Sequence, residues 1–255
     1  MSVFGDYARY YNLLYQDKNY AEEAIFILNI LKKYHNNPKT LLYLGCGTGR
    51  HGFELVKLGL VVDGVDMSET MLKMGMENSD IKNILGNGLN LHNGDVRKVR
   101  LGKNFDVVTS LFHVMSYQNT DEDVLALLET ANKHLDDNGV FLFDFWYSPA
   151  VFGIRPEHRI KVMEDDKIRV KREATPIIDD EKHIVTVHYD VELFDKALNK
   201  TTTFSEDHPM RSFEISEMQK FVDQVGMKML SFGGWMKLES PKDDDWAAWV
   251  LVGKN

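Results

Sequence analysis

The chain has 255 residues, of which 44% are hydrophobic and 27% charged, and its formal net charge is −9. A chain of this size and composition can bury a full hydrophobic core without disulfide bonds or structural metal ions. Its single cysteine, Cys46, excludes an internal disulfide framework. The negative charge disfavours nucleic acid as a partner, because a polyanion is repelled unless a local basic patch outweighs the field.

The same sequence disfavours a membrane protein. No apolar run reaches the roughly 18 to 20 residues that a membrane-spanning helix needs. The first residues do not resemble a signal peptide, so we expect a cytoplasmic protein. We find no internal repeat and no low-complexity linker, and we therefore expect one domain over residues 1–255, as a monomer or a homodimer.

The first predicted element is a helix over residues 20–35. Ala24, Leu28 and Leu31 recur there at helical spacing, which places them on one face. Together with the residues before it, this helix forms a predicted amino-terminal helical cap over residues 1–36.

An apolar strand at residues 40–44 then runs into a turn with glycines at 45, 47 and 49. So tight a turn needs positive φ or close approach to a ligand, and glycine supplies both with the least strain, so Gly47 is the expected contact point. The next apolar run, 61–66, ends in Asp66. A carboxylate at the end of a parallel strand can accept both hydroxyls of a ribose. The two segments therefore predict a site for an adenosine-like group.

The glycine spacing distinguishes two cofactors. In the dinucleotide motif G-x-G-x-x-G the third glycine would fall at Arg50, whereas here it is Gly49. The form G-x-G-x-G, with Asp66 after the second strand, resembles motif I of the class I S-adenosylmethionine-dependent methyltransferases. This resemblance implies S-adenosylmethionine as cofactor and an α/β, Rossmann-like fold, in which helices flank a mostly parallel seven-stranded sheet.

The resemblance extends to the turn after the third predicted strand. Asp95 falls where the family accepts a hydrogen bond from the adenine amino group, and Val96 would offer its backbone amide. An Asx turn that caps the next element is the alternative for Asp95. The remaining cofactor residues that the resemblance assigns are Gly45, Gly47, Met67 and Ser110.

Helices and strands alternate through the first half of the chain. A helix is predicted after Ser68, whose side chain would cap it, and another over residues 121–135. Apolar strands are predicted at the start of 105–117 and at 139–145. Strands separated by helices favour a parallel sheet with right-handed crossovers.

The sequence changes character after Pro149. Segments rich in valine, isoleucine, threonine and aromatic residues occur at 159–174, 183–195 and 200–213, with turns at 178–181 and 197–200. They predict an antiparallel β meander, within an inserted region over 150–213, that roofs the site and selects the acceptor. The last predicted elements are a helix at 216–225 and strands near 227–232 and 246–252.

A narrower resemblance covers most of the chain. It is similar to the methyltransferases that dimethylate the amine of nucleotide-linked amino sugars, of the desosamine and mycaminose type. Besides the cofactor motifs, the matching segments are 11–15, 17–24, 143–146 and 204–208. The resemblance implies that Tyr15 and Tyr20 close over the methionine end of the cofactor; helix packing is the alternative for Tyr20. Asp144 falls where the sugar enzymes have a glutamate near the acceptor.

Methyl transfer requires a lone pair about 3 Å from the sulfonium methyl group and in line with the departing sulfur, so positioning carries much of the acceleration. An amine acceptor must also be neutral. The candidates for a base are His113, His208 and Asp144. His113 follows the strand that should end beside the cofactor, and His208 lies on the predicted roof. An ordinary hydrogen-bonded histidine is the alternative for each.

Three further residues are candidates for the substrate pocket. Tyr117 and Trp146 could form apolar or cation-attracting walls, with core packing as the alternative. Arg211 could meet an acceptor phosphate or carboxylate, and a surface ion pair is its alternative. No metal site is predicted, because Cys46 sits inside the glycine turn and the histidines lack ligand spacing.

The sequence therefore predicts an S-adenosylmethionine-dependent methyltransferase that acts on a small molecule, with the amino group of a nucleotide-linked amino sugar as the preferred acceptor. A small-molecule O-methyltransferase, a carboxyl acceptor and a non-catalytic S-adenosylmethionine-binding regulator are the alternatives. The acceptor atom, the number of methyl groups added and the general base are left open at this point.

Overall fold

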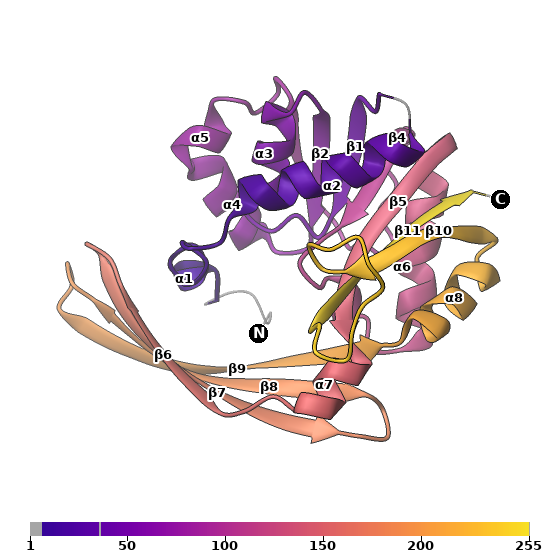
Figure 1. Ribbon diagram of the computed structural model, residues 1–255. Helices are drawn as coiled ribbons and strands as arrows, with labels where there is room; N and C mark the ends of the chain where they lie inside the picture. Colours follow the sequence, from indigo (N-terminus) through magenta and orange to yellow (C-terminus); the bar gives the residue numbers. More distant parts are fainter. Residues whose placement is uncertain (1–6, 36, 255) are drawn as a thin grey trace.

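The computed structural model describes residues 7–35 and 37–254. Positions 1–6 and 36 of the predicted amino-terminal cap lie outside the described residues. Figure 1 shows two parts: a twisted sheet flanked by helices, and a long, curved meander that passes beneath the sheet and the first helix. Residues from both parts line the pocket described below.

Seven strands form the central sheet, in the order β3-β2-β1-β4-β5-β11-β10. The strand β11 is antiparallel to both β5 and β10, while the other four neighbouring pairs are parallel. The bounds are β1 (Thr40–Leu44), β2 (Val61–Asp66), β3 (Leu89–Asn93), β4 (Phe105–Ser110), β5 (Leu135–Tyr147), β10 (Met227–Gly234) and β11 (Ala247–Lys254). The predicted mostly parallel seven-stranded sheet is confirmed.

Helices cover both faces of this sheet. One buried cluster joins the sheet to α2 and α3, and a second joins its other face to α6 and α8. The bounds are α2 (Tyr20–Tyr34), α3 (Arg50–Lys57), α4 (Glu69–Glu77), α5 (Ser79–Lys82), the 3-10 helix η1 (Met115–Tyr117), α6 (Asp121–His134) and α8 (Ile215–Gln224). Among the described residues, no helix is long and apolar enough to cross a membrane.

Side-chain caps explain where three of these helices begin. Asn19, Ser68 and Thr120 each accept a hydrogen bond from the backbone N–H three residues later, at the starts of α2, α4 and α6. Such a cap satisfies one of the N–H groups that a helix start leaves without a partner. The helices predicted over 20–35, after Ser68 and over 121–135 are thereby confirmed.

The second half of the chain contains the antiparallel meander. A short helix, α7 (Ser148–Ile154), precedes it. The meander strands are β6 (Arg159–Glu164), β7 (Ile168–Asp179), β8 (Ile184–Asp195) and β9 (Lys200–Phe213). The meander joins the central sheet where β9 pairs in parallel with the end of β5, at Trp146 and Tyr147.

The meander differs from the prediction in one respect, because the segment 159–174 contains two strands rather than one. The chain reverses at Asp165, whose Oδ1 accepts hydrogen bonds from the backbone N–H groups of Lys167 at 2.8 Å and Ile168 at 2.7 Å. This Asx turn is a local side-chain effect that the β-rich composition of the segment conceals. The meander therefore has four strands.

The first helix, α1 (Tyr7–Leu14), packs on the meander. Its buried residues Tyr10, Leu13 and Leu14 form an apolar cluster with residues of β7 and β8 such as Val170 and Val191. In Figure 1, α1 lies between the meander and the end of the sheet at which β1 and β2 finish. The helix and the meander therefore face the carboxyl ends of the parallel strands together.

Candidate active site

The loop after β1 is shaped by its glycines. Gly45, Gly47 and Gly49 have φ values of 77°, 55° and 79°, in the left-handed region that side chains disfavour. A Cβ atom on Gly45 would lie 2.4 Å from a Cγ atom of Val114, so no side chain fits at that position. The loop leads directly into α3, which begins at Arg50. Its backbone is thereby brought to the carboxyl edge of the sheet.

Asp66 ends β2 at the same edge and reaches the glycine loop. Its Oδ2 accepts a hydrogen bond from the backbone N–H of Gly47 at 2.7 Å, and its Oδ1 accepts one from Ser68 at 2.9 Å. Burial raises the pKa of Asp66, although these two N–H groups act in the opposite direction. Each carboxylate oxygen keeps a further lone pair that can accept from a ligand hydroxyl.

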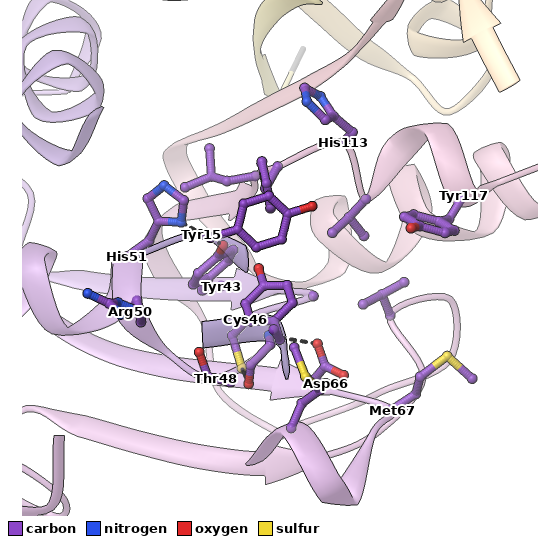
Figure 2. Close-up of a pocket in the computed structure, with 18 of the residues that line it drawn as sticks. Tyr15, Tyr43, Cys46, Thr48, Arg50, His51, Asp66, Met67, His113 and Tyr117 are labelled. Carbon is purple, nitrogen blue, oxygen red and sulfur yellow. Dashed lines mark hydrogen bonds between the residues drawn. The ribbon is translucent and has the colours of Figure 1, made fainter. Parts of the chain in front are cut away.

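The glycine loop, Asp66, the tyrosines of the amino-terminal helices and the meander line one pocket (Figure 2). Most of the predicted site residues line it: Tyr15, Tyr20, Gly45, Gly47, Asp66, Met67, Val96, His113, Tyr117, Trp146 and His208. Figure 2 shows Arg50 and His51 on the side opposite Tyr117. The pocket therefore joins the predicted cofactor residues to the predicted acceptor residues. The individual roles of these residues stay predictions.

Asp95 does not line the pocket. Its carboxylate meets the Arg97 guanidinium, with Nε to Oδ1 at 2.9 Å and Nη2 to Oδ2 at 2.7 Å. The hydrogen bond from Arg97 holds the pKa of Asp95 below its usual range. Its Oδ1 also accepts the backbone N–H of Arg97 at 2.9 Å, which is the Asx-turn arrangement considered as its alternative. Its role toward adenine stays a prediction, and Val96 is the pocket-lining member of this turn.

Arg211, Ser110 and Asp144 also lie outside the pocket lining. Arg211 forms ion pairs of 2.7 Å with Asp121 and with Glu217, so it links α6 to α8. Since its neighbour Met210 lines the pocket, the alternation of strand β9 turns Arg211 to the other face. Ser110 and Asp144 are both fully buried in the sheet.

The structure adds Arg50 to the site, which the sequence reasoning missed. Its guanidinium lies 4.8 Å from the centre of the Tyr20 ring. Arg50 lines the pocket, and no described carboxylate forms an ion pair with it. It therefore offers a cation to an anionic ligand group. The sequence did contain an indication of this, because Arg50 directly follows the glycine motif at the start of the next helix.

His51, another pocket residue that was missed, is almost completely buried beside Arg50. Its Nδ1 lies 3.2 Å from the Tyr43 hydroxyl, and its Nε2 lies 2.7 Å from Glu23 Oε2. Burial lowers the pKa of His51, while the hydrogen bond with Glu23 acts against this. Because Glu23 belongs to α2 and His51 to α3, the pair fixes the amino-terminal cap to the helix that follows the glycine loop.

A buried polar chain connects η1 to the meander that roofs the pocket. The Tyr117 hydroxyl lies 2.8 Å from His208 Nδ1, and His208 Nε2 lies 3.5 Å from Glu206 Oε2. Burial raises the pKa of Tyr117 well above its usual value, so the phenol stays protonated. Tyr189 adds an aromatic wall, with its ring centre 5.1 Å from that of His208. The roof therefore presents aromatic faces and a phenol.

His113 lies on the sheet side of the pocket. Its ring centre is 6.4 Å from that of Trp146, and its side chain is 24% exposed. Its Nδ1 lies 2.7 Å from Oδ2 of the buried Asp144. Among the described residues, no group of three histidine, cysteine, aspartate or glutamate side chains is arranged to hold a metal ion.

Comparisons with known proteins agree with this geometry. Residues 41–139, from β1 into β5, match the family model described as a methyltransferase domain. The dTDP-3-amino-3,4,6-trideoxy-alpha-D-glucopyranose N,N-dimethyltransferase of Streptomyces venezuelae is 32% identical over 149 residues, which are 58% of this chain. The chain spans 60% of the length of that relative.

Two solved structures share the fold along nearly the whole chain. DesVI of Streptomyces venezuelae superposes with a TM-score of 0.79 at 23% identity, over 98% of this chain and 99% of that one. An S-adenosylmethionine-dependent methyltransferase of Clostridium acetobutylicum gives a TM-score of 0.79 at 19% identity, over 96% of each chain. The protein therefore has the Rossmann-like α/β fold of methyltransferases, as the glycine motif predicted.

Proposed function

We propose that the protein transfers a methyl group from S-adenosylmethionine to the amino group of a nucleotide-linked amino sugar. The match of residues 41–139 to a methyltransferase domain supports the reaction, and the 32% identical relative supports the acceptor class. The observation that supports the proposal best is the hydrogen bond between Gly47 and Asp66, because a glycine backbone and a carboxylate that could accept ribose hydroxyls meet at one end of a pocket with an aromatic roof.

The pocket residues fit S-adenosylmethionine. A Cβ atom on Gly47 would meet no other group closer than Met71 Cε, at 3.4 Å, so the glycine leaves room for a ligand against the backbone. Asp66 would accept the ribose hydroxyls, and Val96 would lie beside the adenine. Arg50 and Tyr20 would hold the methionine carboxylate, since a guanidinium and a phenol both donate to it.

The tyrosines of the amino-terminal helices would close this end of the site. Burial raises the pKa of Tyr20 to about 12, so its hydroxyl stays a donor. Tyr15 contacts Phe112 edge-on, with ring centres 4.9 Å apart. These rings exclude water from the reacting atoms, which strengthens the electrostatic interactions inside the pocket.

The acceptor would lie between His113 and the roof. The cofactor, when bound, supplies the electrophilic methyl group on its sulfonium, so the chain has to orient the amine and remove its proton. His113 is the stronger candidate for the proton acceptor, because His208 already contacts Tyr117 and Glu206 through its two ring nitrogens. The aromatic faces of Tyr117 and Trp146 would attract an ammonium group.

We further propose that the protein acts in the cytoplasm, since a nucleotide-linked acceptor is a metabolite of the cell interior. A monomer or a homodimer is expected, and the negative charge of the chain disfavours nucleic acid as a partner. The single domain over 1–255, with a cap at 1–36 and an insertion at 150–213, is the organisation that this proposal assumes.

Mass spectrometry of methylated products tests the proposed function. Purified protein is incubated with S-adenosylmethionine and a panel of dTDP-linked 3-amino and 4-amino sugars, with the corresponding 3-hydroxy sugar as the matched control. We expect a gain of one or two methyl groups on an amino sugar, equimolar S-adenosylhomocysteine and no gain on the hydroxy sugar. Methylation of the hydroxy sugar, or no S-adenosylhomocysteine from any acceptor while the cofactor binds, would refute the proposal.

A further inference from the structure

The turn between β4 and η1 has an unusual backbone. Phe112 and His113 are consecutive residues with φ values of 66° and 65°, in the left-handed region that is sparsely populated except by glycine. Both line the pocket. Such a conformation persists only when the surrounding structure holds it, and it is found at functional sites. The groups that hold this turn therefore also decide where the His113 ring lies.

The Asp144 carboxylate holds the turn from the sheet side. Asp144 lies in β5, which pairs with β4, and it is fully buried. Its Oδ1 and Oδ2 each lie 3.2 Å from the backbone nitrogen of His113. Its Oδ2 also lies 2.7 Å from Nδ1 of the His113 ring. One carboxylate thus contacts both the backbone and the side chain of the same residue.

Two other parts of the structure hold the turn from the remaining sides. The side chain of Val114 fills the space that a Cβ atom on Gly45 would need. The Phe112 ring lies between Tyr15, edge-on at 4.9 Å, and the Lys18 ammonium, 4.4 Å from the ring centre. The glycine loop, the segment between α1 and α2, and β5 therefore meet at this turn, and the ring of His113 has little freedom to move away from Asp144.

We propose that Asp144 is a positioning residue for His113. It does not line the pocket, so it would touch neither cofactor nor acceptor, and it acts by holding the left-handed turn and by keeping the proton of the neutral ring on Nδ1. From the sequence Asp144 was a candidate base. Its burial beneath His113 assigns it the role of a positioning residue instead. The inference rests on the proposed function for the reaction that His113 serves.

The chemistry of the two groups supports this assignment. An ionised carboxylate is only an acceptor, and a neutral imidazole has one donor and one acceptor nitrogen. Nδ1 of His113 is buried and has no other partner among the described residues, although its present angle to Asp144 is not that of a formed hydrogen bond. A proton on Nδ1 satisfies both groups after a small rotation of the ring. It leaves Nε2 as the nitrogen that can take a proton from the acceptor.

Nitrogen-15 NMR of histidine-labelled protein tests the tautomer without any acceptor. The spectrum is recorded with S-adenosylhomocysteine near pH 8.5, about two units above the ordinary histidine pKa of about 6.5, and the His113→Gln variant assigns the signals. We expect a proton on Nδ1 in the natural protein. In Asp144→Asn the amide oxygen can accept from the backbone N–H while its NH₂ donates to Nδ1, which moves the proton to Nε2. A proton on Nε2 in the natural protein would overturn the proposal, whether or not the variant folds.

A double-mutant cycle tests the consequence for catalysis, with the dTDP-3-amino-3,4,6-trideoxy sugar as acceptor. Asp144→Asn and His113→Gln should each lower kcat about 100-fold, with an unchanged KM for S-adenosylmethionine. The double variant should be no slower than either single variant, and Asp144→Glu should recover activity because it restores a carboxylate. Losses that multiply in the double variant would show that Asp144 acts independently of His113. If this sugar is not methylated at all, the proposed function fails, and the NMR result still decides the role of Asp144.

Discussion

The backbone N–H of Gly47 donates a hydrogen bond of 2.7 Å to Oδ2 of Asp66. This bond connects the loop after β1 to the end of β2, two segments separated in sequence by the whole of α3. It orients the carboxylate across the loop, so that a ligand which meets the glycine backbone also meets Asp66.

Replacing Asp66 should remove cofactor binding while the protein stays folded. Hydrogen bonds to charged groups contribute about 1.5–3 kcal/mol each, so loss of two ribose bonds in Asp66→Ala should weaken S-adenosylhomocysteine about 100-fold or more. Isothermal titration calorimetry measures this. Asp63→Asn is the matched control, because Asp63 is buried in the same strand but bonds to His92 and Lys103 outside the pocket. Unchanged affinity in Asp66→Ala would contradict the ribose assignment.

Arg50 should distinguish ligands with and without a methionine carboxylate. We expect Arg50→Ala to weaken S-adenosylhomocysteine about tenfold or more, since a charge-assisted hydrogen bond is lost, and to leave 5′-methylthioadenosine unaffected because it lacks the carboxylate. Arg50→Lys should recover part of the affinity. Equal weakening of both ligands would place the guanidinium near the nucleoside instead. Calorimetry with the two ligands is the measurement.

The meeting of the glycine loop with Asp66 could be predicted in advance, because both lie at the ends of neighbouring strands. Gly47 follows β1 and Asp66 ends β2, and the carboxyl ends of these two strands meet at one edge of a parallel sheet. The helix starts could also be predicted, because the residue that caps a helix, such as Ser68, lies directly before that helix in the sequence. Arg50 could have been found by the same rule, because it begins the helix after the glycine loop.

The acceptor half of the pocket could be predicted only in part: four of the expected residues, among them His208, line it, but which way the meander residues face depends on long-range pairing. Tyr189 and Met210 line the pocket from two meander strands. The register between those strands and the junction of β9 with β5 decide which side chains face the pocket. A shift of one residue exchanges the two faces of a strand. Arg211 was a candidate for the pocket, but its neighbour Met210 lines it and Arg211 forms ion pairs, which was its alternative. Asp144 was a candidate base from the family resemblance, and the sequence did not show that it is buried beneath His113.

The stability of the protein should fall on acidification through His51. Burial lowers the pKa of this residue in the folded state, so the unfolded chain takes up a proton first as the pH falls below about 6.5. The contribution of His51 to the free energy of unfolding is therefore complete above that pH and falls below it. The fall ends at the pH where His51 in the folded protein also takes up a proton. We expect His51→Gln to reduce the fall in Tm between about pH 7.5 and pH 5.5.

His188 provides the control of opposite sign for this pH experiment. A hydrogen bond with the exposed Asp207 raises the pKa of His188, so its stabilisation is complete below about 6.5 and is lost as the pH rises through the folded value. His188→Gln should therefore make the acid-induced fall in Tm slightly larger. An identical profile for the His51 variant and the natural protein would contradict the assignment to His51.

The roof should lose stability when the Tyr117 phenol is removed. Tyr117→Phe deletes the 2.8 Å contact with buried His208, and loss of such a bond costs about 1–2 kcal/mol of unfolding free energy. The matched control is Tyr189→Phe, because the Tyr189 hydroxyl makes no hydrogen bond within the described part of the chain, and its change should stay within about 0.5 kcal/mol. Denaturant unfolding measures both. Equal effects would show that the bond with His208 contributes nothing specific.

Transfer of a ¹³C-labelled methyl group tests the central claim most directly. The protein is incubated with S-adenosylmethionine labelled at the methyl carbon and with the dTDP-3-amino-3,4,6-trideoxy sugar, and the product is examined by NMR. We predict a new N-methyl signal that correlates with the amino-bearing ring carbon, and its absence with Asp66→Ala. A label attached to oxygen, or no transfer by natural protein that binds S-adenosylhomocysteine, would contradict the assignment of this pocket to amine methylation.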